Sequence, residues 1–296
     1  MDKTRYGFFI LLSSALFYSS YGIFSKLIGS NFEPFTQAWT RSAVSLLFFL
    51  AFGVSRKLFT KIRKEDIKWY LVVGIVGSLA VAPTFYSLAH LNIGTALFLA
   101  YAATVITSYI IGLTVFKENL TKTSYLALTL GLAGLSLVYW GDIRADYLEK
   151  VLPVVAAIVS GAFFSIWFAF SKKISHKYAT VQLNTYGYVI AVVMNFLIAI
   201  ALGENFNADF SSSAWLANVG YGAVGFAASG LTVYGFKFID AHKGSIILLS
   251  ELLFGVIFGL AFFGEVLNAT TIIGGLLIMA AALLPHAPAL RRNAQR

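Results

Sequence analysis

The twenty residues from Ser245 to Gly264, SIILLSELLFGVIFGLAFFG, decide the fold class. They contain one ionisable side chain, Glu251, and a helix needs roughly 20 apolar residues to cross a bilayer core about 30 Å thick. The stretch does not alternate polar and apolar residues, as the strands of a membrane barrel do over about 10 residues. We therefore expect a helix, because a span must satisfy its own backbone hydrogen bonds in lipid.

The composition of the whole chain is that of a membrane protein. Of the 296 residues, 58% are hydrophobic and 12% are charged, whereas an average soluble domain has about 25% charged residues. A soluble two-domain enzyme is excluded, because so few charges cannot cover a water-facing surface. We expect an all-α integral membrane protein with ten transmembrane helices at about 7–28, 35–54, 68–90, 93–115, 123–140, 151–171, 180–202, 213–238, 244–263 and 269–284.

Lys and Arg residues concentrate on one side of this arrangement. Eighteen of the 22 fall at the two termini and in alternate loops, whereas the other side has only Arg144 and Lys150. Lys26 and Arg41 lie in or beside a span. Because cytoplasmic loops are enriched in Lys and Arg, we expect a plasma or inner membrane protein with both termini cytoplasmic. The net charge of +9 is then an orientation signal, and no nucleic-acid partner is expected.

The two halves of the chain repeat each other weakly. Gly94-Thr95-Ala96 opens the fourth span and Gly244-Ser245-Ile246 opens the ninth, an offset of 150 residues. Farther on, Phe116–Thr121 matches Phe263–Asn268 at an offset of 147. An odd number of spans in each half makes the second half insert upside down, as in many secondary transporters with a midplane site. The predicted repeats are residues 1–145 and 146–296.

With these motifs the chain resembles the EamA branch of the drug/metabolite transporter superfamily over essentially its whole length. Family members carry a Gly-Glu-x-Leu-like element at the end of the fourth span of each repeat, matched here by Lys117-Glu118-Asn119-Leu120 and Gly264-Glu265-Val266-Leu267. The family's Arg in the second span is matched by Arg41, and the Glu of its Glu-Pro pair by Glu251, where Leu252 replaces proline. The resemblance implies ten spans in two inverted five-span repeats, with spans 1, 3, 4, 6, 8 and 9 around a central cavity.

Ionisable and aromatic side chains within the spans are the candidate site residues. An ionisable group in a membrane faces the protein interior or a cavity by default. Glu251 can bind a proton or neutralise an amine, or it can hydrogen-bond a neighbouring helix or pair with a buried base. Arg41 can anchor a substrate carboxylate or extend to the outer surface. These two are the candidates for coupling or gating, and the substrate-binding candidates are Tyr18, Tyr21, Tyr86, Tyr101, Trp167, Tyr234 and Glu251.

The leading functional hypothesis is a secondary transporter that moves small organic metabolites by alternating access. The family contains many exporters of amino acids, which favours export of this substrate class. The aromatic residues within the spans favour amino acids with apolar or aromatic side chains. One alternative is an organic-cation or drug transporter with Glu251 as counter-ion, and another is a passive uniporter or channel. No ATP-binding motif occurs, so we expect a proton, another cation or the substrate's own gradient to drive transport.

No cofactor, metal site or enzymatic activity is expected. The sequence G-x-G-x-x-G occurs at Gly220–Gly225, but it lies within a span and lacks the preceding strand that a dinucleotide site requires. The expected partners are a small-molecule substrate and membrane lipid. Glycines that permit close helix contact are compatible with a monomer or a homodimer, and these are Gly131, Gly134, Gly274 and Gly275.

Overall fold

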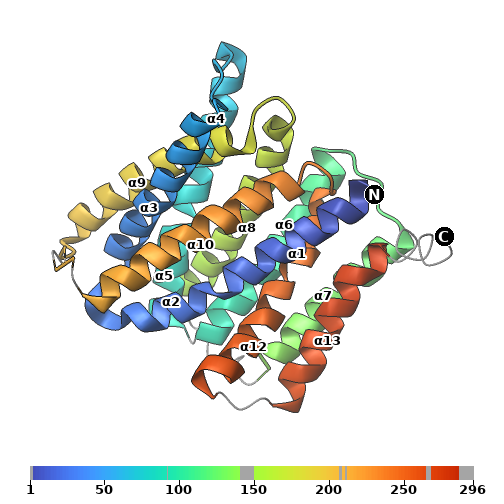
Figure 1. Ribbon diagram of the computed structural model, residues 1–296. Helices are drawn as coiled ribbons and strands as arrows, with labels where there is room; N and C mark the ends of the chain where they lie inside the picture. The colour runs from blue at the N-terminus through green and yellow to red at the C-terminus, as the bar shows by residue number, and fades with distance from the viewer. Residues whose placement is uncertain are drawn as a thin grey trace.

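The computed structural model describes residues 3–91, 93–140, 150–206, 209–210, 212–264 and 268–286, and all regular structure in these ranges is helical (Figure 1). The first half contains α1 (Lys3–Ser19), α2 (Tyr21–Ile28), the 3-10 turn η1 (Gly29–Asn31), α3 (Pro34–Ser55), α4 (Lys64–Leu79), α5 (Val81–His90), α6 (Ile93–Thr114) and α7 (Lys122–Val138). The second half contains α8 (Val151–Ser175), α9 (Thr180–Leu202), α10 (Ser213–Gly235), α11 (Ala241–Leu248), α12 (Ser250–Phe263), α13 (Ala269–Leu283) and the 3-10 turn η3 (Leu284–His286).

Eight helical stretches in the described part are long and apolar enough to cross a membrane. They are Lys3–Ile28, Pro34–Ser55, Lys64–Leu88, Thr95–Thr114, Val151–Ser175, Thr180–Leu202, Ser213–Gly235 and Ala241–Phe262. The fifth and tenth predicted spans correspond to the shorter apolar helices α7 and α13. The predicted count of ten spans therefore stays a prediction. Arg144 and Glu265 lie outside the described residues, as do the basic residues counted at the C-terminus, which are Arg291, Arg292 and Arg296.

Three of the long stretches are broken near their middle. The breaks fall at Ser20 between α1 and α2, at Ala80 between α4 and α5, and at Leu249 between α11 and α12. All three residues keep α-region dihedral angles, so the chain continues in roughly its original direction. Pro83 follows the second break, and its missing N–H leaves the carbonyl of Leu79 without its helical donor. Freed backbone groups at this depth are tolerated where they are buried in protein or line a cavity.

Helix contacts relate the two halves by a two-fold arrangement. α3 packs along α9 and α7 along α13, so two helices contact their own counterparts in the other half (Figure 1). The other contacts occur in matching pairs: α6 packs on α8 as α11 and α12 pack on α1, and α4 packs on α9 as α10 packs on α3. The two sequence halves therefore have corresponding neighbours throughout the bundle.

The glycines of α7 and α13 pack these helices together within one chain. A Cβ atom on Gly134 would lie 2.6 Å from the carbonyl oxygen of Gly274, and one on Gly274 would lie 2.5 Å from that of Gly134. Side chains at these positions would force the two backbones apart. Of the two uses that the sequence leaves open for these glycines, the structure shows packing inside the monomer.

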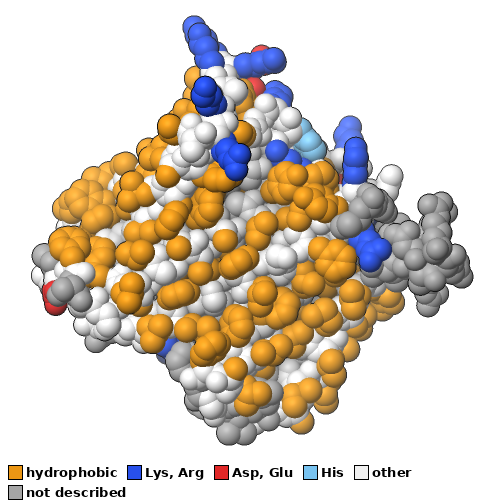
Figure 2. Space-filling model, viewed as in Figure 1, with side chains coloured by type: hydrophobic (Ala, Val, Ile, Leu, Met, Phe, Trp, Pro, Cys, Tyr) orange, Lys and Arg blue, Asp and Glu red, His pale blue; other side chains and the backbone are white. Residues whose placement is uncertain are grey.

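The surface separates into an apolar flank and a basic end. Hydrophobic side chains cover the visible flank of the bundle, and Lys and Arg side chains gather at one end (Figure 2). We call this the basic end, and it comprises the α3–α4 loop, the end of α8 and the α10–α11 loop, with Lys61, Arg63, Lys173 and Lys237 among its residues. This separation agrees with the charge count from the sequence, and the cytoplasmic location of the basic end stays a prediction.

Candidate functional site

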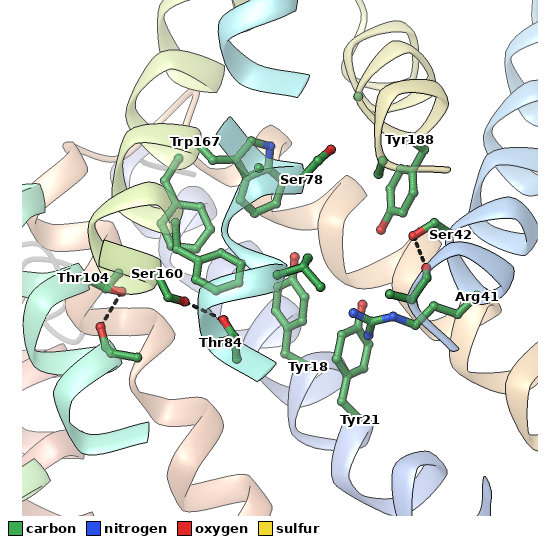
Figure 3. Close-up of a pocket in the computed structure, with 18 of the residues that line it drawn as sticks. Tyr18, Tyr21, Arg41, Ser42, Ser78, Thr84, Thr104, Ser160, Trp167 and Tyr188 are labelled. Carbon is green, nitrogen blue, oxygen red and sulfur yellow. Dashed lines mark hydrogen bonds between the residues drawn. The ribbon is translucent and has the colours of Figure 1, made fainter. Parts of the chain in front are cut away.

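A cavity of about 460 Å³ lies between the two halves, and all three helix breaks border it. Tyr18 and Tyr21 flank the first break, Ser78 and Val81 the second, and Glu251 follows the third. Helices α3, α6, α8, α9 and α10 complete the wall. Figure 3 shows Arg41 and Tyr188 on one side of the cavity and Trp167, Thr84 and Ser160 on the other.

Glu251 is the acidic group of this cavity. It occupies the second position of α12, in the first turn of that helix. The Tyr101 hydroxyl on α6 donates a hydrogen bond of 3.1 Å to Oε1 of Glu251. Tyr101 and Glu251 are 150 residues apart, which is the repeat offset of their two spans, so corresponding positions of the two halves meet here. Among the described residues, no Lys, Arg or His forms an ion pair with Glu251.

Arg41 is the basic group of the same cavity. Its guanidinium carbon lies 4.5 Å from the ring centre of Tyr221 on α10 and 5.4 Å from that of Tyr21 on α2. Contact with ring faces stabilises a cation but occupies none of its hydrogen-bond donors. No carboxylate within the described ranges pairs with Arg41. The side chain lines the cavity, so its planar donor set can receive a carboxylate there.

The remaining wall combines aromatic surface with hydroxyl and amide groups. Trp167, Phe164 and Phe85 provide apolar area. Thr84 and Ser160 share a hydrogen bond of 2.5 Å between their hydroxyls. Asn195 Oδ1 is buried in this wall without a partner among the described residues, so it can accept a hydrogen bond from a bound solute.

Six of the eight residues singled out from the sequence line this cavity. They are Tyr18, Tyr21, Arg41, Tyr101, Trp167 and Glu251. Their part in binding or coupling stays a proposal.

Tyr86 and Tyr234 lie elsewhere. Tyr86 is 39% exposed and packs on His90, with ring centres 4.3 Å apart. Tyr234 is 36% exposed and packs on Phe238, with ring centres 5.3 Å apart. Their neighbours Phe85 and Val233 line the cavity instead, because one residue along a helix turns the side chain by about 100°. We therefore leave both tyrosines out of the proposed site.

Sequence reasoning missed other lining residues, including Tyr188, Tyr221 and Asn195. An Asn inside an apolar run such as VVMNFLI was an available signal for Asn195, because polar groups within spans are costly unless they are used. Tyr188 and Tyr221 lie within predicted spans beside small residues, as the chosen tyrosines do, but the sequence does not show which side of a helix faces the cavity. Among the described residues, no group of three His, Cys, Asp or Glu side chains could hold a metal ion.

Comparison with known proteins agrees with this architecture. An uncharacterized transporter of Archaeoglobus fulgidus is 28% identical over 286 residues, covering 95% of this chain and 96% of its own. The pseudopaline exporter CntI of Pseudomonas aeruginosa is 23% identical over 291 residues, covering 96% of each chain. A crystal structure superimposes with a TM-score of 0.80 at 19% identity, covering 97% of this chain and 99% of its own, which supports the fold alone.

The sequence pattern of one transporter family occurs twice in the chain. The EamA-like transporter family matches residues 5–140 and again residues 151–285. The two matches together span nearly the whole length, and they fall on the two halves whose helices have corresponding neighbours. The chain therefore belongs to the EamA-like transporter family.

Proposed function

We propose that the protein is a secondary transporter, and not an enzyme, that exports apolar or aromatic amino acids by alternating access. In this proposal the chain forms ten spans in two inverted repeats, residues 1–145 and 146–296. It lies in the plasma or inner membrane with the basic end and both termini in the cytoplasm. Family membership supports transport of a small molecule, and the relative CntI is an exporter by name.

One observation carries the choice of an amino acid. Arg41 and Glu251 line the same cavity, and neither has an oppositely charged side-chain partner among the residues described. Charges at membrane depth are costly unless they are neutralised. A zwitterion neutralises both, with its carboxylate on Arg41 and its ammonium on Glu251. The cavity volume of about 460 Å³ lies within the usual range of small-molecule sites, about 300 to 1,000 Å³.

The aromatic wall favours an amino acid with an apolar side chain. Tyr18 and Trp167 present ring surface to the cavity, and such rings bind apolar groups while their polar edges hydrogen-bond. Glu251 is also the proposed coupling group, because a carboxylate without a basic partner can exchange a proton for the substrate's ammonium group.

Flux into liposomes tests this proposal directly. Purified protein in liposomes should exchange labelled leucine, phenylalanine or tryptophan faster than empty liposomes do, and an imposed pH gradient should drive accumulation above equilibrium. The Glu251→Gln variant is the matched control, because it keeps the shape of the side chain and removes its charge. The amino-acid proposal is abandoned if none of the twenty amino acids shows flux above empty liposomes.

A second candidate, an organic-cation transporter, is favoured by the hydrogen-bonded carboxylate beside aromatic rings. A cation would use Glu251 as its counter-ion and leave Arg41 unused. Flux of a quaternary amine that survives Arg41→Gln and is lost in Glu251→Gln would support this candidate over the amino acid. A uniporter or channel would instead equilibrate its solute under a pH gradient without accumulating it.

A further inference from the structure

A buried cluster of charged groups lies at the basic end, outside the cavity. Glu118, in the α6–α7 loop, is its centre, and its side chain is 6% exposed. Its carboxylate accepts hydrogen bonds from Lys172 Nζ at 2.9 Å, from the backbone N–H of Ala241 at 2.8 Å and from Nδ1 of His242 at 2.6 Å. The other ring nitrogen of His242 lies 3.3 Å from the Ser124 hydroxyl, so the imidazole is held on both sides.

The surrounding charges are arranged in alternation. Lys172 also lies 3.6 Å from Asp240, and Asp240 pairs with Lys243 at 2.7 Å. The Lys172 ammonium lies 5.5 Å from the ring centre of Phe116. Each ionised group in the cluster therefore has an opposite charge beside it, and separating them requires that water replace these contacts.

The cluster joins the two halves of the chain. Glu118 belongs to the first half, whereas Lys172 lies in the last turn of α8 and His242 in the first turn of α11, both in the second half. Gly112 on α6 provides the space for this contact, because a Cβ atom there would lie 2.6 Å from Oε2 of Glu118. Alternating access requires the two halves to separate at one end and then at the other, so opening the basic end must pull this cluster apart.

The cluster also borders the cavity. Ser171 precedes Lys172 and lines the cavity, and Ser245 lines it while donating a hydrogen bond of 3.0 Å to the His242 carbonyl. Next to them, Leu183 and Val233 line the cavity and pack into a buried cluster with Tyr70 and Tyr178. The charged cluster and this apolar cluster therefore both lie beside the part of the cavity that is nearest the basic end.

A mechanical connection leads from Glu118 to the site. Its carboxylate caps the first turn of α11, which has only eight residues. α11 ends at the break at Leu249, and Glu251 lies two residues beyond. A movement of α11 therefore acts directly on the backbone that positions Glu251.

We propose that Glu118, Lys172 and His242 form a latch that closes the basic end of the cavity, and that opening this end requires Glu118 to release the N-terminus of α11. The proposal rests on alternating access, as does the proposed function, but it does not depend on the identity of the substrate.

The chain contains no cysteine, so one introduced thiol reports accessibility without background. Ser171→Cys places the reporter at the basic end of the cavity, beside the latch. A membrane-impermeant maleimide is added to vesicles that expose the basic end, and the exposed reporter Lys61→Cys calibrates their orientation. Glu118→Gln replaces the carboxylate with a neutral amide, which has one acceptor oxygen for the same donors. Hydrogen bonds to a charged group are stronger than those to a neutral one. We therefore expect the thiol introduced by Ser171→Cys to be labelled about tenfold faster in this variant.

The matched control is Glu65→Gln, which removes a carboxylate at the same end from an exposed ion pair with Arg63 and should leave labelling unchanged. If Glu118→Gln does not fold, Lys172→Gln tests the same latch, because it removes the ion pair and keeps the cap on α11. We expect about a threefold increase there, as one of the charged contacts is lost. Unchanged labelling in whichever of these variants folds overturns the latch. Labelling needs no substrate, so failed amino-acid flux with faster labelling would reject the substrate and keep the latch.

Discussion

The repeat-related spans α6 and α11–α12 have corresponding positions in the fold but differ in two ways. α6 is continuous from Ile93 to Thr114, whereas its counterpart is broken at Leu249. At the matched positions inside them, α6 carries Tyr101 and α12 carries Glu251, and the two side chains meet across the interface. A carboxylate thus lies in the first turn of a new helix, while the continuous helix supplies a neutral donor.

The same difference recurs around the whole cavity. Each broken span has an unbroken counterpart in the other half: α1–α2 corresponds to α8, α4–α5 to α10 and α11–α12 to α6. Breaks absorb changes in dihedral angle, whereas a continuous helix transmits movement as a rigid rod. The two halves therefore share one arrangement of helices, and they differ in which spans are broken and in which of them carries the carboxylate.

The largest expected effect concerns Glu118, which ties the end of α6 to the start of α11. Burial alone would raise the pKa of its carboxyl, but hydrogen bonds from His242 and from the Ala241 N–H, with the charge of Lys172, lower that pKa from 4.5 to about 2. Because the pKa is lower in the folded protein, ionisation of Glu118 stabilises the folded state at pH values above 4.5, the unfolded pKa. This stabilisation is lost as the pH falls from 4.5 toward 2. The size of the effect is on the order of 3 kcal/mol.

Thermal melting of the purified protein in detergent between pH 7 and pH 3 measures this contribution. Glu118→Gln should melt lower than the native chain at pH 7, and the gap should narrow as the pH falls below 4.5, the ordinary pKa of the carboxyl. Glu204→Gln is a useful comparison, because Glu204 accepts hydrogen bonds from the backbone N–H groups of Phe35 and Thr36 at the start of α3. A gap for Glu118→Gln that stays constant with pH contradicts the assigned ionisation.

Glu251 should give the next largest effect, because it is the charge that distinguishes α12 from α6. We expect Glu251→Gln to lower amino-acid flux in liposomes by about 100-fold. The variant removes one partner of the proposed ion pair between Glu251 and the substrate's ammonium group, and such a loss costs about 2 to 5 kcal/mol. The reciprocal variant Tyr101→Glu, with Glu251→Tyr in the same chain, moves the carboxylate to the continuous helix. Full flux in that double variant would show that the break at Leu249 is not needed for the function of the charge.

Arg41 tests the opposite pole of the cavity. Arg41→Gln removes the cation between Tyr21 and Tyr221, and we expect the KM for amino acids to rise about 30-fold through loss of a charged contact to the carboxylate. Arg41→Lys should recover part of the affinity, because an ammonium keeps the charge and loses the planar fork. An unchanged KM in both variants would remove Arg41 from the substrate site and favour the organic-cation candidate.

The sequence was sufficient for the helical membrane fold and the family, because lipid forces each span to satisfy its own backbone and leaves long apolar runs. It did not predict the helix breaks: Leu249 is a good helix former, and Pro83, which follows the break at Ala80, was a signal in the sequence that was not used. It also could not assign the direction of a side chain around its helix. Phe85 lines the cavity where Tyr86 was expected, and the sequence left open whether Arg41 reaches the cavity or the surface.

Substitution of Tyr101 should have the smallest effect, and it tests most directly the contact between Tyr101 and Glu251. Tyr101→Phe removes only the hydroxyl that donates to Glu251 over 3.1 Å, and a hydrogen bond to a charged group contributes about 1.5 kcal/mol or more, of which water in the cavity can replace part. We expect flux to fall about fivefold. Tyr86→Phe is the matched control outside the cavity and should change flux by less than about twofold, since exposed substitutions have small effects. If Tyr101→Phe lowers flux no more than Tyr86→Phe does, the contact between Tyr101 and Glu251 follows from the repeat symmetry alone. Glu251 would then support transport without the hydrogen bond from Tyr101.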